Sequence, residues 1–176
     1  MSEERPIRKM CDAVDDGLIR LGKCLSWLNA ILILVIVTQV TLRYGFGRGL
    51  VILEELEWHL YSVAFMFGLS YALVTDAHVR VDILHGRLSK KTQHWIEILG
   101  TLFLLLPFIA AVIIHGWDFF YDSWIHNESS SAPLGLPWRW AIKGAIPLSF
   151  GLLGIAALSR MIRSFTVVFG QEDGNH

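Results

Sequence analysis

The chain has 176 residues, of which 53% are hydrophobic, and its 15 basic and 16 acidic residues give a formal net charge of −1. The net charge excludes little, because a membrane protein sorts its charges by side. The composition excludes a separate soluble domain, because four long apolar runs take up nearly the whole chain. We therefore expect one compact membrane unit over residues 1–176, without a nucleic-acid partner.

The N-terminal arm 1–23 is charged but has an apolar stripe. Its apolar residues recur at helical spacing, at Ile7, Met10, Cys11, Val14, Leu18, Leu21 and Leu25. This pattern predicts an amphipathic helix lying on the inner membrane surface. The apolar run that follows is too long for the core of a signal peptide, so we expect it to be retained as a membrane span.

Four spans are predicted from the charges that bracket the apolar runs. The bracketing pairs are Lys23 and Arg43, Glu57 and Asp76, Glu97 and Asp118, and Lys143 and Arg160. The first three gaps hold roughly 18 to 20 residues, enough for a helix to cross about 30 Å of hydrocarbon. The prediction is an all-α membrane protein with spans at about 24–42, 58–75, 97–117 and 138–160.

The segment between the first two spans contains a turn and an acidic stretch. Residues 43–49 (RYGFGRG) have glycine at every second position from Gly45, which predicts a turn. Residues 50–57 (LVILEELE) are apolar but contain Glu54, Glu55 and Glu57, which predicts a short helix in the outer membrane interface. Span two then repeats a small residue at every fourth position, Ala64, Gly68 and Ala72, which predicts a close helix contact.

Prolines and histidines mark the later spans. Pro107 and Pro147 lie within spans three and four and favour kinks. Histidines on facing helices could bind haem b, so His59 and His115 leave a haem-bearing membrane anchor of an oxidoreductase as an alternative. Their place beside the interfacial Trp58 and Trp117 favours a simple interfacial role. No metal site and no cofactor are expected.

The orientation is predicted from the basic residues. The arm, the loop between spans two and three and the C-terminal tail hold eleven of the fifteen, namely Arg5, Arg8, Lys9, Arg20, Lys23, Arg80, Arg87, Lys90, Lys91, Arg160 and Arg163. The remaining four, Arg43, Arg48, Arg139 and Lys143, fall on the other side. The positive-inside rule therefore places both termini in the cytoplasm.

The interiors of the four spans contain few polar groups and no Asp, Glu, Lys or Arg. A carrier or channel usually places ionisable groups within the bilayer, where only function justifies their cost. The chain therefore resembles an accessory or scaffold subunit whose spans pack against a larger partner. An independent small carrier remains a second alternative.

The segment where span two leaves the membrane, Thr75–Leu84 (TDAHVRVDIL), is the most distinctive string. Together with Glu54–Leu56 (EEL), Gly68 and Leu136–Pro147 (LPWRWAIKGAIP), it resembles the small permease, or Q subunit, of tripartite ATP-independent periplasmic (TRAP) transporters. The resemblance covers about Arg43 to Arg163. Ser149 departs from it, since the family often has glycine soon after the proline.

The resemblance implies a non-catalytic scaffold subunit of a sodium-coupled importer of organic acids in a bacterial inner membrane. Its expected partners are a large permease (M) subunit, a periplasmic substrate-binding protein and the lipid bilayer. His78, Arg80 and Asp82 would hold the inner end of span two at its junction with the large subunit. The segments Leu50–Glu57 and Asp118–Arg139 would help to dock the binding protein, with Glu54, Glu55 and Glu57 as candidate contacts.

Overall fold

The computed structural model describes residues 4–77 and 89–169, and among these residues all regular structure is helical. The elements are α1 (Glu4–Gly45), α2 (Val51–Val74), α4 (Lys90–Gly100), the π-helical turn η1 (Thr101–Leu105), α5 (Leu106–Ile125) and α6 (Arg139–Phe169). The predicted all-α class is confirmed for these residues.

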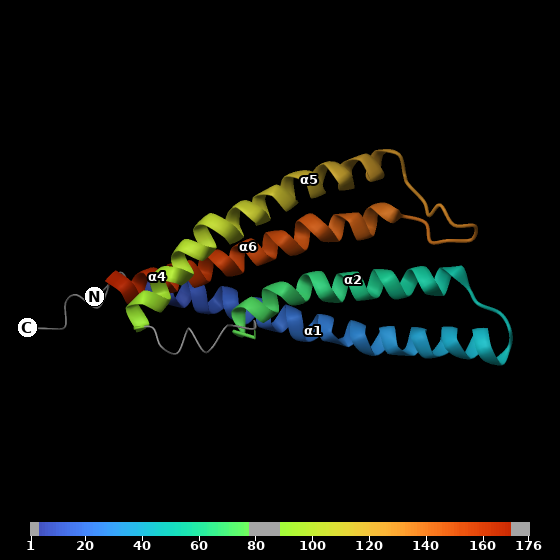
Figure 1. Ribbon diagram of the computed structural model, residues 1–176, viewed down its shortest axis with the longest axis horizontal. Coiled ribbons are helices and arrows are strands. Elements are labelled where there is room, and N and C mark those ends of the chain that lie inside the picture. The colour runs from blue at the N-terminus through green and yellow to red at the C-terminus, as the bar shows by residue number, and fades with distance from the viewer. Residues whose placement is uncertain (1–3, 78–88, 170–176) are drawn as a thin grey trace, which may run out of the picture.

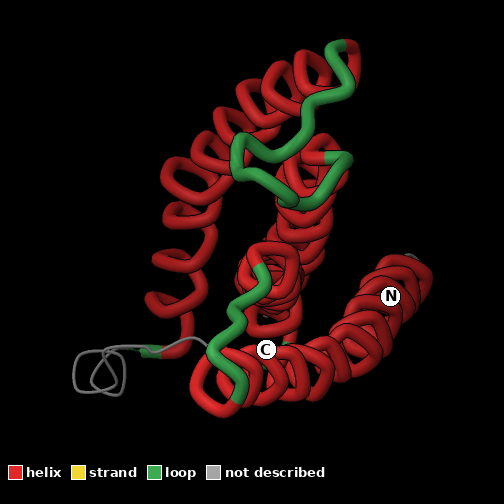
Figure 2. Tube along the Cα trace, turned by 90° about the vertical axis from the view of Figure 1, so that its right-hand side faces the viewer, coloured by secondary structure: helices red, strands yellow, loops and turns green. Residues whose placement is uncertain are grey.

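Helix α6 lies at the centre of the fold. Figure 1 shows α5 along one side of α6 and α2 along the other, with α1 on the far side of α2. The buried cluster of Ile109, Leu153 and Ala157 joins α5 to α6, and Leu69 and Leu73 of α2 pack against it. Figure 2 shows that the helices form an open arrangement and not a closed ring. The core is therefore thin, and each outer helix keeps one face uncovered by this chain.

Three helical segments are long and apolar enough to cross a membrane: Arg8–Gly45, Lys91–Ile125 and Arg139–Phe169. In the most apolar part of the segment Arg8–Gly45, only 6% of the residues are buried within the chain, whereas 33% are buried in that of Arg139–Phe169. This difference agrees with the central place of α6. Helix α2, which carries Glu54, Glu55 and Glu57 in its first two turns, is not among these segments. The structure thus supports three membrane helices, and the predicted second span, at about 58–75, remains a prediction.

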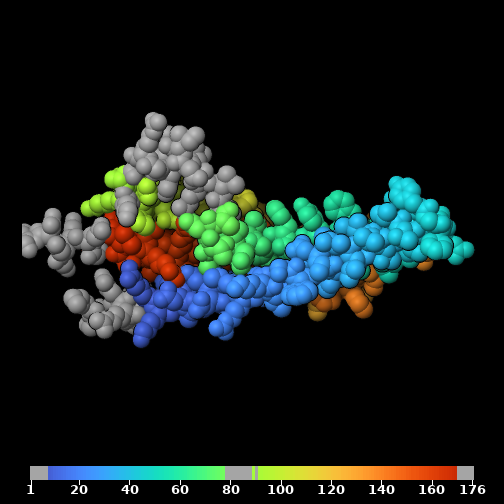
Figure 3. Space-filling view, turned by 90° about the horizontal axis from the view of Figure 1, so that it is seen from below, coloured from blue at the N-terminus to red at the C-terminus, as the bar shows by residue number. Residues whose placement is uncertain are grey.

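The first helix is longer than the predicted first span. Helix α1 runs for 42 residues without a break between the N-terminal arm and the apolar run. Cys11 and Leu18 of the arm are buried, because the start of α1 packs against the C-terminal part of α6. Figure 3 shows this end, with the last turns of α6 (red) between α1 (blue) and α4 (yellow-green). From Glu4 onward the arm is helical and amphipathic, and part of its apolar face is covered by protein.

Helix α1 ends in the glycine-rich segment, as predicted. The Phe46 and Arg48 N–H groups both donate to the Leu42 carbonyl, at 3.2 and 3.0 Å, and Gly47 has a φ of +64° that favours glycine. Residues 51–57 are helical, as expected for the segment before span two, but they continue into α2 without a break. The predicted short interfacial helix is therefore not a separate element.

The two prolines are accommodated differently. Just before Pro107 the backbone widens into the π turn η1, where the Leu106 N–H donates to the Thr101 carbonyl. A wide turn next to a residue without an N–H shifts the hydrogen-bond register, and α4, η1 and α5 follow one curved path (Figure 1). Pro147 is buried inside α6, which continues through it.

Helices α5 and α6 make a close contact at small residues. A Cβ added at Gly144 would lie 3.0 Å from the Phe120 ring, and one at Gly116 would lie 3.1 Å from Ile146. At Gly68, in contrast, a Cβ would meet no atom within 4 Å. Within this chain, the predicted close contact along Ala64, Gly68 and Ala72 is not made at Gly68.

Candidate functional site

Polar side chains gather at the two ends of the helices, and these two sites are the candidate functional features. The N-terminus of α1 and the C-terminus of α6 lie at one end, here called the terminal end (Figure 1). The turn between α1 and α2 and the loop between α5 and α6 lie at the other, here called the loop end. The described apolar helix interiors separate the two.

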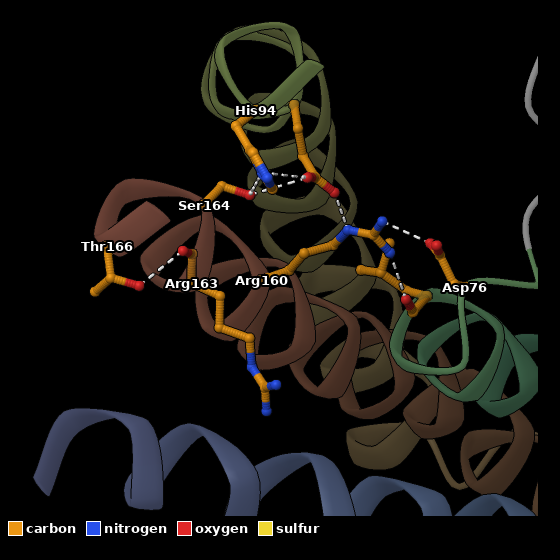
Figure 4. A network of polar contacts seen from close by, with 8 residues as sticks. Asp76, His94, Arg160, Arg163, Ser164 and Thr166 are labelled. Carbon is orange, nitrogen blue, oxygen red and sulfur yellow. Dashed lines mark hydrogen bonds and ion pairs between the residues drawn. The ribbon is translucent and has the colours of Figure 1, made fainter. Parts of the chain in front are cut away.

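Arg160 of α6 organises the terminal end. Its Nε donates to Glu97 of α4, one terminal nitrogen donates to the Leu73 carbonyl at 2.8 Å, and the other lies 2.6 Å from Asp76 Oδ1. Figure 4 shows the guanidinium between these partners. A planar group with five donors can reach three acceptors at once. Arg160 thus connects the ends of α2, α4 and α6.

Glu97 has a second partner on α6. Its Oε2 accepts a hydrogen bond of 2.9 Å from the Ser164 hydroxyl, which also lies 3.2 Å from His94 Nδ1. The Arg160 and Glu97 side chains are only 21% and 23% exposed. Charge-assisted hydrogen bonds between partly buried groups are stronger than those between neutral groups in water. We name Asp76, His94, Glu97, Arg160 and Ser164 the Arg160 cluster.

A neighbouring ion pair fastens the N-terminal arm. Arg163 of α6 lies 2.8 Å from Asp12 Oδ1 and 2.6 Å from Asp15 Oδ2, and the Ser159 hydroxyl donates to Asp15 at 3.0 Å. Asp15 lies three residues after Asp12 and four after the buried Cys11, so it shares a face of α1 with each of them. The Arg160 cluster and the Arg163 contacts together connect every described helix at the terminal end to α6.

Glu55 organises the loop end. Its carboxylate, at the start of α2, accepts hydrogen bonds from the Ser130 hydroxyl and, at 2.6 Å, from the Leu136 N–H. A Cβ on Gly135 would lie 2.8 Å from Glu55 Oε2, so glycine is needed there for this close approach. Glu55 therefore ties the loop 126–138 to α2 through contacts 75 and 81 residues apart in sequence.

A second carboxylate closes the same loop onto α6. Glu128 pairs with Lys143, and its Oε1 lies 3.5 Å from an Arg139 terminal nitrogen. The Lys143 ammonium also lies 3.8 Å from the centre of the Phe119 ring. The hydrogen bond from Lys143 lowers the pKa of the Glu128 carboxyl below its ordinary value. Glu128 is thus held in its charged form beside two cations.

The turn between α1 and α2 has its own polar contact. The buried Gln39 accepts from the Leu50 N–H at 3.2 Å and donates to Glu54 at 3.2 Å, while Arg43 lies 3.0 Å from Glu54. Since both groups of the amide are used, Gln39 costs little as a buried polar residue. This contact fixes the end of α1 against the start of α2.

The structure places the predicted site residues in different settings. Glu54 and Arg43 come together, Glu55 binds the loop, and Lys143 pairs with Glu128. Glu57 has one buried carboxylate oxygen with no hydrogen-bond partner among the described residues. Ala64 and Gly68 line a hollow beside α1, and Ala72 is half-buried. His78, Arg80 and Asp82 lie outside the described residues.

Sequence reasoning missed the central groups of both sites. Arg160 and Glu97 were used as the ends of apolar runs, and Arg160 also as an orientation signal, but they were not paired with each other. Opposite charges at the same end of neighbouring antiparallel helices are a signal for such pairing. Glu128, Gln39 and Arg163 gave no signal in the sequence, since their partners are set by helix rotation and loop conformation.

The haem alternative does not fit the helix arrangement. His59 lies on α2 and His115 on α5, and α6 runs between these two helices (Figure 1). His59 Nδ1 also lies 2.6 Å from the Glu55 carbonyl of its own helix. Among residues 4–77 and 89–169, no group of three or more His, Cys, Asp or Glu side chains is arranged to hold a metal ion.

Comparison with known proteins identifies the family of the chain. A protein of Haemophilus influenzae that is named as a TRAP transporter small permease protein is 28% identical to this chain over 153 residues. The match covers 85% of this chain and 89% of that protein. The family model of the DctQ component of tripartite ATP-independent periplasmic transporters matches residues 32–167. Because that match includes most of the chain, the protein belongs to the DctQ family of TRAP transporter small permease subunits.

Proposed function

We propose that this chain is a non-catalytic scaffold subunit of a sodium-coupled, binding-protein-dependent importer of organic acids. It would pair in a bacterial inner membrane with a large permease subunit, and both of its termini would lie in the cytoplasm. The family supports a transporter small subunit, while the sodium coupling, the substrate class and the partners are part of the proposal.

The observation that carries the scaffold role is the open helix arrangement. Large apolar side chains of α1 remain exposed, among them Trp27 at 73%, Leu34 at 67% and Ile33 at 60%. In a bilayer such faces are covered by lipid or by the helices of a partner. A chain that carried a solute alone would instead need its helices to enclose a polar path, and the charged sites described here lie at the two ends.

The two polar sites support a rigid role. The Arg160 cluster joins three helices at the terminal end, and Glu55 and Glu128 hold the loop at the other. A scaffold must keep its shape while a partner moves, and helix ends fixed by charge-assisted bonds serve that purpose. His78, Arg80 and Asp82 directly follow Asp76 of the cluster in sequence, which supports their proposed place at the junction with the large subunit.

The loop end is the proposed contact for the substrate-binding protein. Glu54 and Glu55 are engaged within the chain, so we assign them the role of shaping this surface, and we keep Glu57 as a candidate direct contact. Exposed charges at the rim of such an interface affect the association rate more than the affinity.

Reconstitution tests the proposal. Proteoliposomes with this chain alone should show no uptake of any organic acid, whereas proteoliposomes with the chain, its co-purified large subunit and the binding protein should show uptake that requires a sodium gradient. Uptake by the chain alone would contradict the scaffold role. Uptake by the complex without dependence on sodium would contradict only the proposed coupling.

A further inference from the structure

A hollow lies between α1 and α2. It has a volume of about 220 Å³ and is lined by Gly22, Lys23, Leu25, Ser26 and Asn29 of α1 and by Ala64, Gly68 and Tyr71 of α2. Close to it the Tyr71 ring lies directly against Gly22, and a Cβ there would clash with the ring. Beyond this contact, Ala64 and Gly68 are too small to fill the space between the helices.

The lining of the hollow has its charged residue near the terminal end, and the small residues of α2 lie deeper. On α1, Gly22 and Lys23 lie nearest the terminal end. Ser26 lies one turn deeper than Lys23, and Asn29 lies about 9 Å deeper at 1.5 Å per residue. On α2, Tyr71 lies nearest the terminal end and Ala64 deepest. Lys23 lies at the start of the first apolar run, and Trp27 follows Lys23 by four residues. Because tryptophan prefers the membrane interface, Lys23 lies at the level of the lipid headgroups.

The cation at the mouth has no anionic partner among residues 4–77 and 89–169. Lys23 is exposed and forms no ion pair with any described residue, and no acidic side chain lines the hollow. The Asn29 amide uses one N–H for the Ser26 carbonyl at 3.3 Å, and its second N–H is left to donate. The site therefore offers a positive charge and an amide donor above an apolar floor.

We propose that this hollow binds one phospholipid with an anionic headgroup. The phosphate would pair with Lys23, the glycerol ester region would lie beside Ser26 and Asn29, and one acyl chain would lie on Ala64 and Gly68. Basic pockets between membrane helices bind headgroups in this way. The small residues of α2 would then serve lipid binding in addition to helix packing.

This proposal requires only that the chain lies in a bilayer, so it does not depend on the scaffold function. The proposal also gives a reason for the open space at Gly68. No described side chain fills that space, and an acyl chain could occupy it. A lipid held there would fill the gap between α1 and α2, and a bulky side chain at Gly68 would exclude it.

The test is native mass spectrometry of the full chain in mild detergent, titrated with phosphatidylglycerol. We expect one tightly bound lipid. Lys23→Gln should weaken its binding about five-fold, the equivalent of roughly 1 kcal/mol for one basic residue at the membrane surface. Arg20→Gln, which removes a cation of the same helix outside the hollow, should leave the affinity unchanged.

A second pair of variants tests the acyl part. Gly68→Leu should abolish binding of the tight lipid, whereas Gly151→Leu, at a helical glycine of α6 that also faces open space, should not. Equal effects of Lys23→Gln and Arg20→Gln, or retention of the lipid by a folded Gly68→Leu chain, would overturn the proposal. Displacement of the lipid by inorganic phosphate would show an anion site without an acyl site and would also overturn it.

Discussion

Replacement of Arg160 by methionine tests the Arg160 cluster most sharply. Methionine keeps much of the length and apolar volume of the arginine stem, but it removes the three contacts to Glu97, Leu73 and Asp76. Glu97 would then keep the Ser164 hydroxyl as a partner and lose the Arg160 guanidinium. The variant thus separates α4 and the end of α2 from α6 without creating a large cavity.

The expected loss of stability is about 2–4 kcal/mol. Breaking a fully buried ion pair from one side costs about 3–5 kcal/mol, and the remaining exposure of Arg160 and Glu97, 21% and 23%, reduces this figure. The hydrogen bond to the Leu73 carbonyl adds about 1.5–3 kcal/mol, since its donor is charged. The contact to Asp76, which is 54% exposed, adds about 1 kcal/mol at most. These contributions are not additive, because the three contacts share one side chain.

Thermal unfolding in mild detergent measures the effect. For a chain of this size each kcal/mol shifts the Tm by about 2–4 °C, so Arg160→Met should lower it by about 4–16 °C. Arg160→Lys should fall in between, because an ammonium keeps the charge but cannot reach all three acceptors. Arg20→Met, at an exposed arginine, is the matched control. An Arg160→Met protein that unfolds within a degree of the wild type would refute the structural role of the cluster.

Three further predictions concern single contacts. Glu55→Gln leaves one carbonyl oxygen to accept from two donors of the loop, Ser130 and Leu136, so the loop should open more often. A thiol introduced into this loop by Ser129→Cys should then react several-fold faster with maleimide, whereas Glu54→Gln should not change that rate. The pKa of Glu128 is lowered in the folded chain, so the ionised carboxylate stabilises the fold above the unfolded pKa of about 4.5, and this effect is lost as the pH falls through the folded pKa. The Tm difference between wild type and Glu128→Gln should therefore shrink in acid. A difference that stays constant with pH would contradict this. Gly22→Ala should destabilise by about 1–3 kcal/mol through its clash with Tyr71, whereas Gly17→Ala, in open space, should be neutral or stabilising by Tm.

The sequence predicted the helices and the turn after the first span because their signals are local. Apolar runs bracketed by charge indicate membrane helices, and the alternating glycines of residues 43–49 indicate where α1 ends. The continuity of α1 through Lys23 was not predicted, since a change from an amphipathic to an apolar pattern does not itself break a helix. The same holds for α2, whose acidic start is helical and joined to the rest.

The pairing of side chains was less accessible from the sequence. Glu55 was identified as a polar contact, but its partners Ser130 and Leu136 depend on a loop conformation that includes positive φ angles at Asn127, Leu134 and Trp138. The small residues at 64, 68 and 72 were identified as one helical face, but the partner of that face depends on how α2 is rotated against α1. Helix rotation is set by the sum of many weak contacts, which no single motif encodes.

Affinity purification of the tagged full chain from its native membrane, in mild detergent, tests the scaffold proposal most directly. Mass spectrometry should identify a large multi-span permease as a partner, and the absorption spectrum of the complex should show no Soret band. A chain recovered with haem and oxidoreductase subunits, or one recovered alone from membranes that contain the permease, would contradict the account.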